Sequence, residues 1–254
     1  MAWMPRAGRL LHSWPNTTKL ARMGDFPKNL KHFGHCDVLV GNLPGIAKRC
    51  SDLGWQKPAI TISNFTQVVK FKKVSRTTLN TPVSSFIITA SGRFVPRKGF
   101  DVLIRAIAKL KNVTLWLMGE GQERQNLSEL ASELGIENRV KFIGWVEEPI
   151  NYIKASDAFV MPSRHEPLGN ALLEAWQAKV PTVSTKSEGP TWYMRDKIDG
   201  ILILSGATNP YLSNEYNSIE INASAERLIE SVFLIRKHQE AKIIFSGGSG
   251  YLNF

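Results

Sequence analysis

Two glutamates lie eight residues apart in SRHEPLGNALLEAW, the stretch from Ser163 to Trp176. Apolar residues at helical spacing follow the first glutamate, Glu166, and predict a helix over 168–178. Eight helical residues rise by roughly 12 Å, the length scale of a nucleotide diphosphate-sugar. Glu166 could accept hydrogen bonds from sugar hydroxyls near the helix start. Glu174, further along, could accept them from a ribose diol.

The backbone at the start of this helix adds to that interpretation. Pro167 is predicted at about the first helical position, where its missing N–H does no harm. Gly169 and Asn170 would then present the free N–H groups of the first turn to an anion outside the helix. The segment therefore combines anion-binding backbone groups with a carboxylate acceptor.

A simpler interpretation of the two glutamates is also open. Glu166 would be an acidic residue that stabilises a helix N-terminus, and Glu174 would lie on a solvated face. Against this, Leu173 and Ala175 flank Glu174 within an apolar run. A carboxylate in such surroundings needs a partner, which favours a binding role.

A second loop offers cations. SGRFVPRKGFD, residues 91–101, follows a predicted strand, and Gly92 and Gly99 relax its backbone. Its cations are Arg93, Arg97 and Lys98. Cations beside the start of the next helix form an anion site suited to a diphosphate. The alternative is that these side chains are solvated loop residues.

From residue 85 onward, short apolar runs alternate with amphipathic stretches. This alternation predicts a doubly wound α/β domain with a parallel sheet and helices on both faces, complete over residues 85–205. We expect strands at 86–90, 113–118, 140–143, 158–161, 182–184 and 201–204, and helices at 100–110, 124–134, 150–155, 168–178 and 223–237. Gly135 is a plausible C-cap for the second of these helices.

The N-terminal part of the chain is organised differently. We expect a single β–α–β unit there, with strands at 37–40 and 60–62 and a helix at 44–53, preceded by irregular basic sequence. One such unit buries too little surface to fold alone. The predicted domains are thus a partial N-terminal domain at 1–66, a linker at 67–84 and a C-terminal domain at 85–254. The first of these looks like the end of a domain whose beginning is absent.

All of the excess positive charge lies in the first third. Residues 1–76 hold 13 Lys and Arg against 3 Asp and Glu, whereas the remaining 178 residues hold 19 of each. Such a region suits an anionic partner, either a membrane surface or a phosphorylated acceptor, although a solvated basic face is also compatible. Nucleic acid is disfavoured, because no recognition motif or basic–aromatic pattern accompanies the charge.

Targeting and redox signals are sparse. The first 30 residues lack a signal-peptide core, and no apolar run of about 18 residues occurs. The two cysteines fit no metal-ligand spacing. We therefore expect a cytoplasmic protein, with peripheral contact to the inner face of an anionic membrane as a hypothesis.

The combined motifs resemble the C-terminal domain of the retaining GT-B glycosyltransferases of family 4, the group 1 glycosyl transferases. The resemblance is carried by ASGRFVPRKGFDVLIRA, LWLMGEGQERQNL, VKFIGW, ASDAFVMPSRHEPLGNALLEAW and DGILI, in that order. GNLPGIAKRCSDLGW and ITISNF resemble the end of the family's N-terminal domain. The similarity is strongest to proteobacterial enzymes that build lipopolysaccharide core or similar envelope glycans. The resemblance implies a GT-B fold with a complete C-terminal and a partial N-terminal Rossmann-like domain.

The resemblance also implies roles for individual residues. Arg93 and Lys98 would hold the donor diphosphate, with Gly92 in the same loop. Glu166 would contact the donor sugar, and Glu174 would bind the ribose. Backbone groups near Leu168, Gly169 and Asn170 would assist Glu166, and backbone around Trp145 and Val146 would face the base. Such enzymes retain the anomeric configuration and need neither metal nor cofactor. The substrates would be a nucleotide-sugar donor and a glycan or lipid-linked acceptor.

The chain departs from the family pattern in its N-terminal part. The family's Gly-rich first loop and reactive-site histidine have no counterpart, and none of His12, His32, His35 and His165 is assigned a catalytic role. Two other functions therefore stay open: a non-catalytic nucleotide-sugar-binding fragment or subunit, and a nucleotide-sugar epimerase of the same fold. Detection of a glycosylated product would distinguish the transferase from both.

Overall fold

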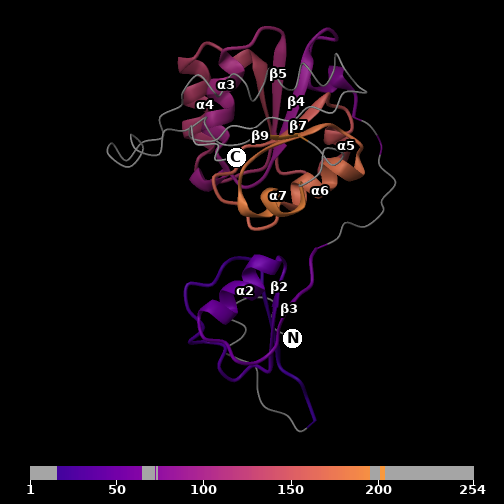
Figure 1. The fold of residues 1–254 in the computed structure, drawn as a ribbon. Coiled ribbons are helices and arrows are strands. Elements are labelled where there is room, and N and C mark those ends of the chain that lie inside the picture. The colour runs from indigo at the N-terminus through magenta and orange to yellow at the C-terminus, as the bar shows by residue number, and fades with distance from the viewer. Residues whose placement is uncertain (1–15, 65–71, 73, 195–200, 204–254) are drawn as a thin grey trace, which may run out of the picture. The chain divides into compact units, whose positions relative to one another are not determined.

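The computed structural model describes residues 16–64, 72, 74–194 and 201–203 (Figure 1). These residues fall into two units. The first consists of residues 16–64 together with Pro167–Asn170, and the second of the other described residues. Each unit is described by itself below.

The first unit is built on a parallel sheet of three strands in the order β1-β2-β3. The strands are β1 (Leu20–Met23), β2 (Val38–Gly41) and β3 (Ala59–Thr61), and α2 (Pro44–Asp52) connects the last two. Pro44 occupies the start of α2, where no N–H is needed. Ile46 and Cys50, one turn apart, are the buried residues of α2.

The sequence pattern predicts β2, α2 and β3 to within one residue at each end, but β1 was not predicted. That strand lies in the stretch described as irregular basic sequence. Its four residues, LARM, contain no apolar run, and only Ala21 and Met23 are buried. The alternation of buried and half-buried positions is too short to be recognised without the neighbouring strand β2, with which β1 pairs in parallel.

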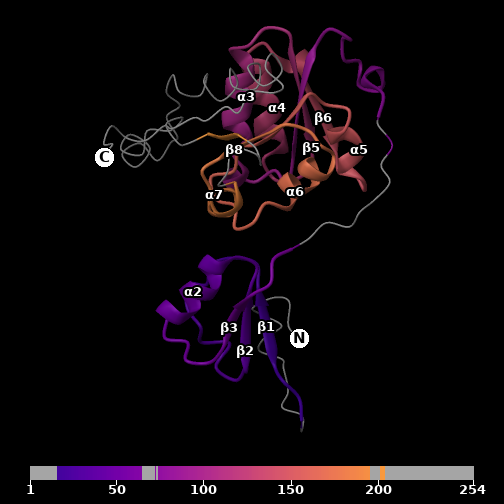
Figure 2. The same cartoon turned by 45° about the vertical axis from the view of Figure 1, so that its right-hand side comes forward.

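The second unit contains a parallel sheet of six strands in the order β6-β5-β4-β7-β8-β9 (Figures 1 and 2). The strands are β4 (Phe86–Ser91), β5 (Val113–Met118), β6 (Val140–Gly144), β7 (Ala158–Met161), β8 (Thr182–Thr185) and β9 (Ile201–Ile203). Counted from β4, this is the strand order 3-2-1-4-5-6 of a Rossmann-like domain. The predicted doubly wound α/β fold is confirmed, and each predicted strand agrees with the structure to within one residue.

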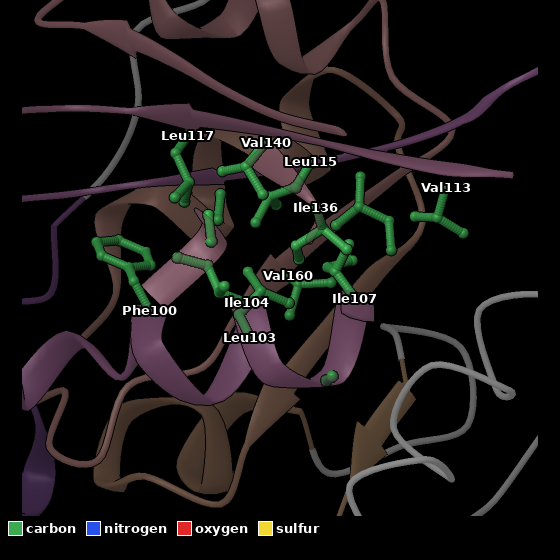
Figure 3. Packing of buried hydrophobic residues seen from close by; sticks show 14 of the residues in the cluster. Phe100, Leu103, Ile104, Ile107, Val113, Leu115, Leu117, Ile136, Val140 and Val160 are labelled. Atoms are coloured by element: carbon green, nitrogen blue, oxygen red, sulfur yellow. The ribbon is translucent and has the colours of Figure 1, made fainter. Parts of the chain in front are cut away.

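Five α-helices are described in the second unit: α3 (Phe100–Ala108), α4 (Arg124–Glu133), α5 (Pro149–Ile153), α6 (Asn170–Gln177, all but its first residue in this unit) and α7 (Glu188–Tyr193). α3 and α4 pack on one face of the sheet, where Leu103, Ile104 and Ile107 meet strand residues such as Leu115 and Val160 (Figure 3). α5 and α6 pack on the opposite face, against a separate apolar cluster around Phe159 and Met161. Both faces of the parallel sheet are thus covered, as such sheets require.

Helix ends show where local signals succeed and fail. Gly135 adopts φ +65° just after α4, and the Ile136 N–H bonds the Ala131 carbonyl at 2.9 Å, so the predicted C-cap is confirmed. In contrast, α6 begins at Asn170 rather than at residue 168, and Pro167 lies outside it. α7 was not predicted. The helix expected at 223–237 lies outside the described residues.

Candidate active site at the sheet switch point

Between β4 and β7 the strand order of the second unit reverses. Strands numbered from β4 continue outward on one side through β5 and β6, and on the other side through β7, β8 and β9. In open parallel sheets, ligands bind beyond the carboxyl ends of the strands at such a point. The loop after β4 contains Lys98, and the loop after β7 contains Glu166. The fold therefore brings together two segments that the sequence separates by 68 residues.

The two loops are in direct backbone contact. The Arg164 N–H donates to the Arg97 carbonyl at 2.8 Å. A Cβ atom at Gly99 would lie only 2.1 Å from the Pro162 carbonyl oxygen, and Gly99 also has φ +67°. Any other residue at this position would push the loops apart and strain the backbone. The Gly99 predicted to relax the loop is thus also what permits its approach to Pro162.

Lys98 and Glu166 form an ion pair between Nζ and Oε2. Their side chains are 17% and 13% exposed, so water screens the pair only partly. The Ser163 hydroxyl donates to the same carboxylate oxygen at 3.2 Å. Both residues were predicted from the sequence as separate site residues, but their contact with each other was not predicted. A lysine ammonium has three N–H donors, so Lys98 can keep Glu166 and still donate to a ligand oxygen.

The other predicted residues of the first loop lie beside this pair. Gly92 has φ +149°, and a Cβ atom there would lie 3.3 Å from Cε of Lys98. The aliphatic stem of Lys98 therefore runs along the Gly92 backbone. Arg93 is exposed to solvent, whereas the next residue, Phe94, is fully buried. Phe94 anchors the loop in the core while Arg93 remains accessible to a ligand.

Arg164 was missed by sequence analysis, although it fixes the two loops to each other. Its guanidinium contacts both carboxylate oxygens of Asp101, at 2.9 and 2.6 Å, and also donates to the Pro96 carbonyl. Asp101 belongs to the first turn of α3. Planar two-point pairing of this kind restricts orientation as well as distance. Only the tertiary contact identifies Arg164, because its neighbours in sequence suggest an ordinary loop cation.

Glu174 lies half-buried on α6, and no described residue donates a hydrogen bond to its carboxylate. Burial, and secondarily the charge of Glu148, raises the pKa of Glu174. Because α6 begins at Asn170, the two glutamates do not lie on one continuous helix, and the helical rise used to estimate their separation does not apply. Glu166 belongs to the loop, Glu174 to the second turn of α6.

The remaining predicted residues lie at two further places. Trp145 follows β6 with its side chain 75% exposed, while Val146 packs against the apolar cluster around Phe159. Leu168 is buried, Gly169 has φ +90°, and Asn170 is the first residue of α6. An exposed indole at the carboxyl end of a strand offers a flat apolar surface to a planar ligand.

Over residues 16–64, 72, 74–194 and 201–203, no three His, Cys, Asp or Glu side chains gather in a way that could hold a metal ion. Within those same ranges, none of the helices has the length and apolar character needed to cross a bilayer.

Residues 71–230 match the family described as Glycosyl transferases group 1. The chain is 44% identical over 230 residues to the lipopolysaccharide core biosynthesis glycosyltransferase LpsE of Rhizobium meliloti (strain 1021), which covers 91% of this chain and 68% of LpsE. It is 40% identical over 206 residues to LpsD of the same organism, with 81% and 60% covered.

Solved structures give the same picture of the fold. Anabaena Alr3699/HepE in complex with UDP and glucose matches with a TM-score of 0.70 at 20% identity, over 87% of this chain and 62% of HepE. WaaG, a glycosyltransferase involved in lipopolysaccharide biosynthesis, matches with a TM-score of 0.56 at 17% identity, over 90% and 75%. The family match, the relatives and the fold agree, and the chain belongs to the group 1 glycosyl transferases, enzymes of GT-B fold.

Proposed function

We propose that this protein transfers a sugar, with retention of configuration and without a metal ion, from a nucleotide diphosphate-sugar to a lipopolysaccharide core or a related envelope or lipid-linked glycan. The observation that carries the proposal is the Lys98–Glu166 ion pair at the sheet switch point. LpsE and LpsD are both named for lipopolysaccharide core biosynthesis, which supports this class of acceptor. HepE has been solved with UDP and with UDP-glucose, which supports this class of donor.

The chemistry of the pair suits departure of a diphosphate. Negative charge accumulates on the leaving group as the glycosidic bond breaks, and fixed cations stabilise that charge most effectively where water is partly excluded. Lys98 is held in place by Glu166 before any ligand arrives, and Arg93 is accessible in the same loop. The two cations would neutralise the diphosphate and take the role that a metal ion plays in other transferases.

The carboxylates would serve as acceptors for hydroxyl groups. Glu166 has one oxygen committed to Lys98 and Ser163, which leaves the other for the donor sugar, with backbone N–H groups near Leu168, Gly169 and Asn170 assisting. Glu174 lacks a donor among the described residues and would accept from the ribose. The backbone around Trp145 and Val146 would face the base.

Calorimetric titration with UDP-, GDP- and ADP-sugars tests the donor site. We expect micromolar binding of one nucleotide, weakened in Lys98→Ala and Glu174→Ala but unchanged in Lys111→Ala, an exposed lysine outside these loops. Absence of binding to the folded protein by all three nucleotide-sugars would contradict the proposal.

Product analysis then tests the reaction. Incubation of the bound nucleotide-sugar with lipopolysaccharide core fragments should yield a glycosylated product whose new bond has the donor's anomeric configuration, with undiminished rate in EDTA. Release of an isomerised sugar would indicate an epimerase. Binding without turnover would indicate a non-catalytic binding subunit.

The location of the reaction is part of the same proposal. We propose a cytoplasmic enzyme that contacts the inner face of an anionic membrane through its basic first third, where 13 Lys and Arg stand against 3 Asp and Glu. Pelleting with vesicles that contain anionic lipid should exceed pelleting with neutral vesicles and should decline with salt. Equal pelleting with both would count against membrane contact.

A further inference from the structure

The backbone of Glu166 is held on both sides by the start of α7. The Glu166 N–H donates to Oε2 of Glu188 at 3.2 Å. The Glu166 carbonyl accepts from the Gly189 N–H at 2.9 Å. Two consecutive residues of α7 therefore fix the peptide groups before and after the Glu166 side chain. Neither Glu188 nor Gly189 was assigned a role from the sequence.

The second oxygen of the same carboxylate reaches the residue before Glu166. Oε1 of Glu188 lies 2.8 Å from Nδ1 of His165. The two side chains are 35% and 39% exposed, so an ion pair here contributes little to stability. The consequence of the contact is geometric, because one carboxylate restrains two successive residues of the loop after β7.

Glu188 is suited to this task by its charge state. Burial acts to raise its pKa. Hydrogen bonds from its own backbone N–H, the His165 ring and the Glu166 N–H outweigh that effect and lower the pKa of Glu188. An ionised carboxylate only accepts hydrogen bonds, so both of its oxygens are available to the loop.

The sheet explains why α7 reaches this loop. β8 pairs with β7, and the carboxyl ends of parallel neighbours lie at the same edge. The hydroxyl of Thr185, the last residue of β8, donates to the Ser163 carbonyl at 2.5 Å. α7 begins shortly after β8, at Glu188. Glu188 therefore lies beside Glu166 in the segment that follows β8, whereas Lys98 lies in the loop that follows β4.

We propose that Glu188, supported by His165, is a positioning residue for sugar transfer. Lys98 and Ser163 hold the side chain of Glu166, and Glu188 holds its backbone, so that the carboxylate meets the donor sugar in one orientation. The inference rests on the proposed function, because it assigns to Glu188 the alignment of Glu166 for that reaction. It requires no contact between Glu188 and the substrate.

The test compares Glu188→Ala and Glu188→Gln in the whole chain of 254 residues, with kcat and donor affinity measured separately. We expect Glu188→Ala to lower kcat by about tenfold or more, because small misplacements of a reacting group are costly. Donor affinity should stay within about threefold of the original protein, since the diphosphate and ribose contacts are intact. Glu188→Gln keeps an amide oxygen for the Glu166 N–H and should restore most of the rate.

Two controls separate positioning from general damage. Glu133→Ala removes an exposed carboxylate on α4 and should change neither kcat nor the melting temperature. His165→Ala should lower kcat by less than Glu188→Ala, because the Glu166 N–H keeps its acceptor. If Glu188→Ala fails to fold, the comparison of Glu188→Gln with Glu188→Asp decides, since Asp retains the charge but withdraws it from the loop.

The outcomes are distinguishable from failure of the proposed function. If the original protein transfers no sugar, the proposed function is wrong. If it transfers sugar and Glu188→Ala does so at the same kcat, the positioning role is wrong. A fall in donor affinity as large as the fall in kcat would also overturn it, because Glu188 would then act in binding.

Discussion

Glu166 and Glu174 are both candidate acceptors for hydroxyl groups of the nucleotide-sugar, yet they differ in the contacts that they make within the second unit. Glu166 contacts Lys98 and Ser163 through its side chain and Glu188 and Gly189 through its backbone. Glu174 has no donor to its carboxylate among the described residues, and its pKa is raised by burial. The Glu166 end of the candidate site is assembled before a ligand binds, whereas the part of the chain that the structure describes gives the Glu174 carboxylate no donors of the kind that a ribose diol would supply.

From this difference we expect the two ends to contribute to different steps, one to catalysis and the other to donor binding. Catalysis gains most from groups whose orientation is fixed before the reaction, because no reorganisation is then needed as charge develops. Affinity gains most where a ligand satisfies a polar group that the free protein leaves unsatisfied. Changes near Glu166 should therefore act mainly on kcat, and changes at Glu174 mainly on donor affinity.

Removal of the Lys98 side chain should have the largest effect. Lys98→Ala deletes a fixed cation from the proposed diphosphate site and leaves Glu166, only 13% exposed, without its counter-charge. We expect kcat to fall by about 10²-fold or more, in line with the loss of one transition-state donor. Steady-state kinetics with the cognate nucleotide-sugar measures this, with Lys111→Ala as the matched exposed lysine. A loss confined to donor affinity would remove the distinction between the two ends.

Glu174→Ala should have the next largest effect, on affinity. A hydrogen bond to a charged acceptor contributes about 1.5–3 kcal/mol, which corresponds to a tenfold to hundredfold weaker donor complex. At saturating donor, kcat should be nearly unchanged. Because burial raises the pKa of Glu174, donor affinity should also fall as pH is lowered toward that pKa, and Glu174→Gln should abolish this dependence. A pH-independent affinity in the original protein would contradict the assignment of the ribose to Glu174.

Arg164→Lys tests the Glu166 end indirectly, through the alignment of the two loops that hold Lys98 and Glu166. Lysine keeps the charge but cannot contact both oxygens of Asp101 in the fixed planar geometry that Arg164 provides. The loops after β4 and β7 should lose part of their alignment, and we expect kcat to fall by several-fold, about threefold to tenfold, with donor affinity retained. Parallel losses of kcat and affinity would show that Arg164 serves both ends of the site.

The contrast between the two ends also explains what the sequence could and could not predict. Buried parallel strands such as β5 and β7 are continuous apolar runs, so their bounds were predicted correctly. Lys98 and Glu166 were proposed from loop chemistry, but their pairing depends on the strand order, which no local pattern contains. Glu188 was not predicted as a site residue because its contact with Glu166 also depends on the strand order. Its segment, SEGP, has the Gly and Pro of a loop, and its partner lies 22 residues earlier.

The smallest expected effect is on stability, and its sign is opposite to the effect on binding. A glutamate whose pKa is raised by folding costs nothing well below its ordinary value of 4.5, where it is protonated in both the folded and unfolded states. The cost develops as pH rises from that value through the raised pKa, and it is complete above the raised pKa. Glu174→Gln removes the charge, so the free variant should melt at a slightly higher temperature than the original protein at pH 7, and the difference should shrink toward pH 4.

Glu148→Gln should reproduce part of the rise in melting temperature, because the charge of Glu148 is the second cause of the raised pKa of Glu174, whereas Glu133→Gln should not. If Glu174→Gln binds donor more weakly yet has a higher melting temperature, Glu174 serves ligand binding and lowers the stability of the ligand-free protein. A lower melting temperature of the variant would show that Glu174 already has a stabilising partner.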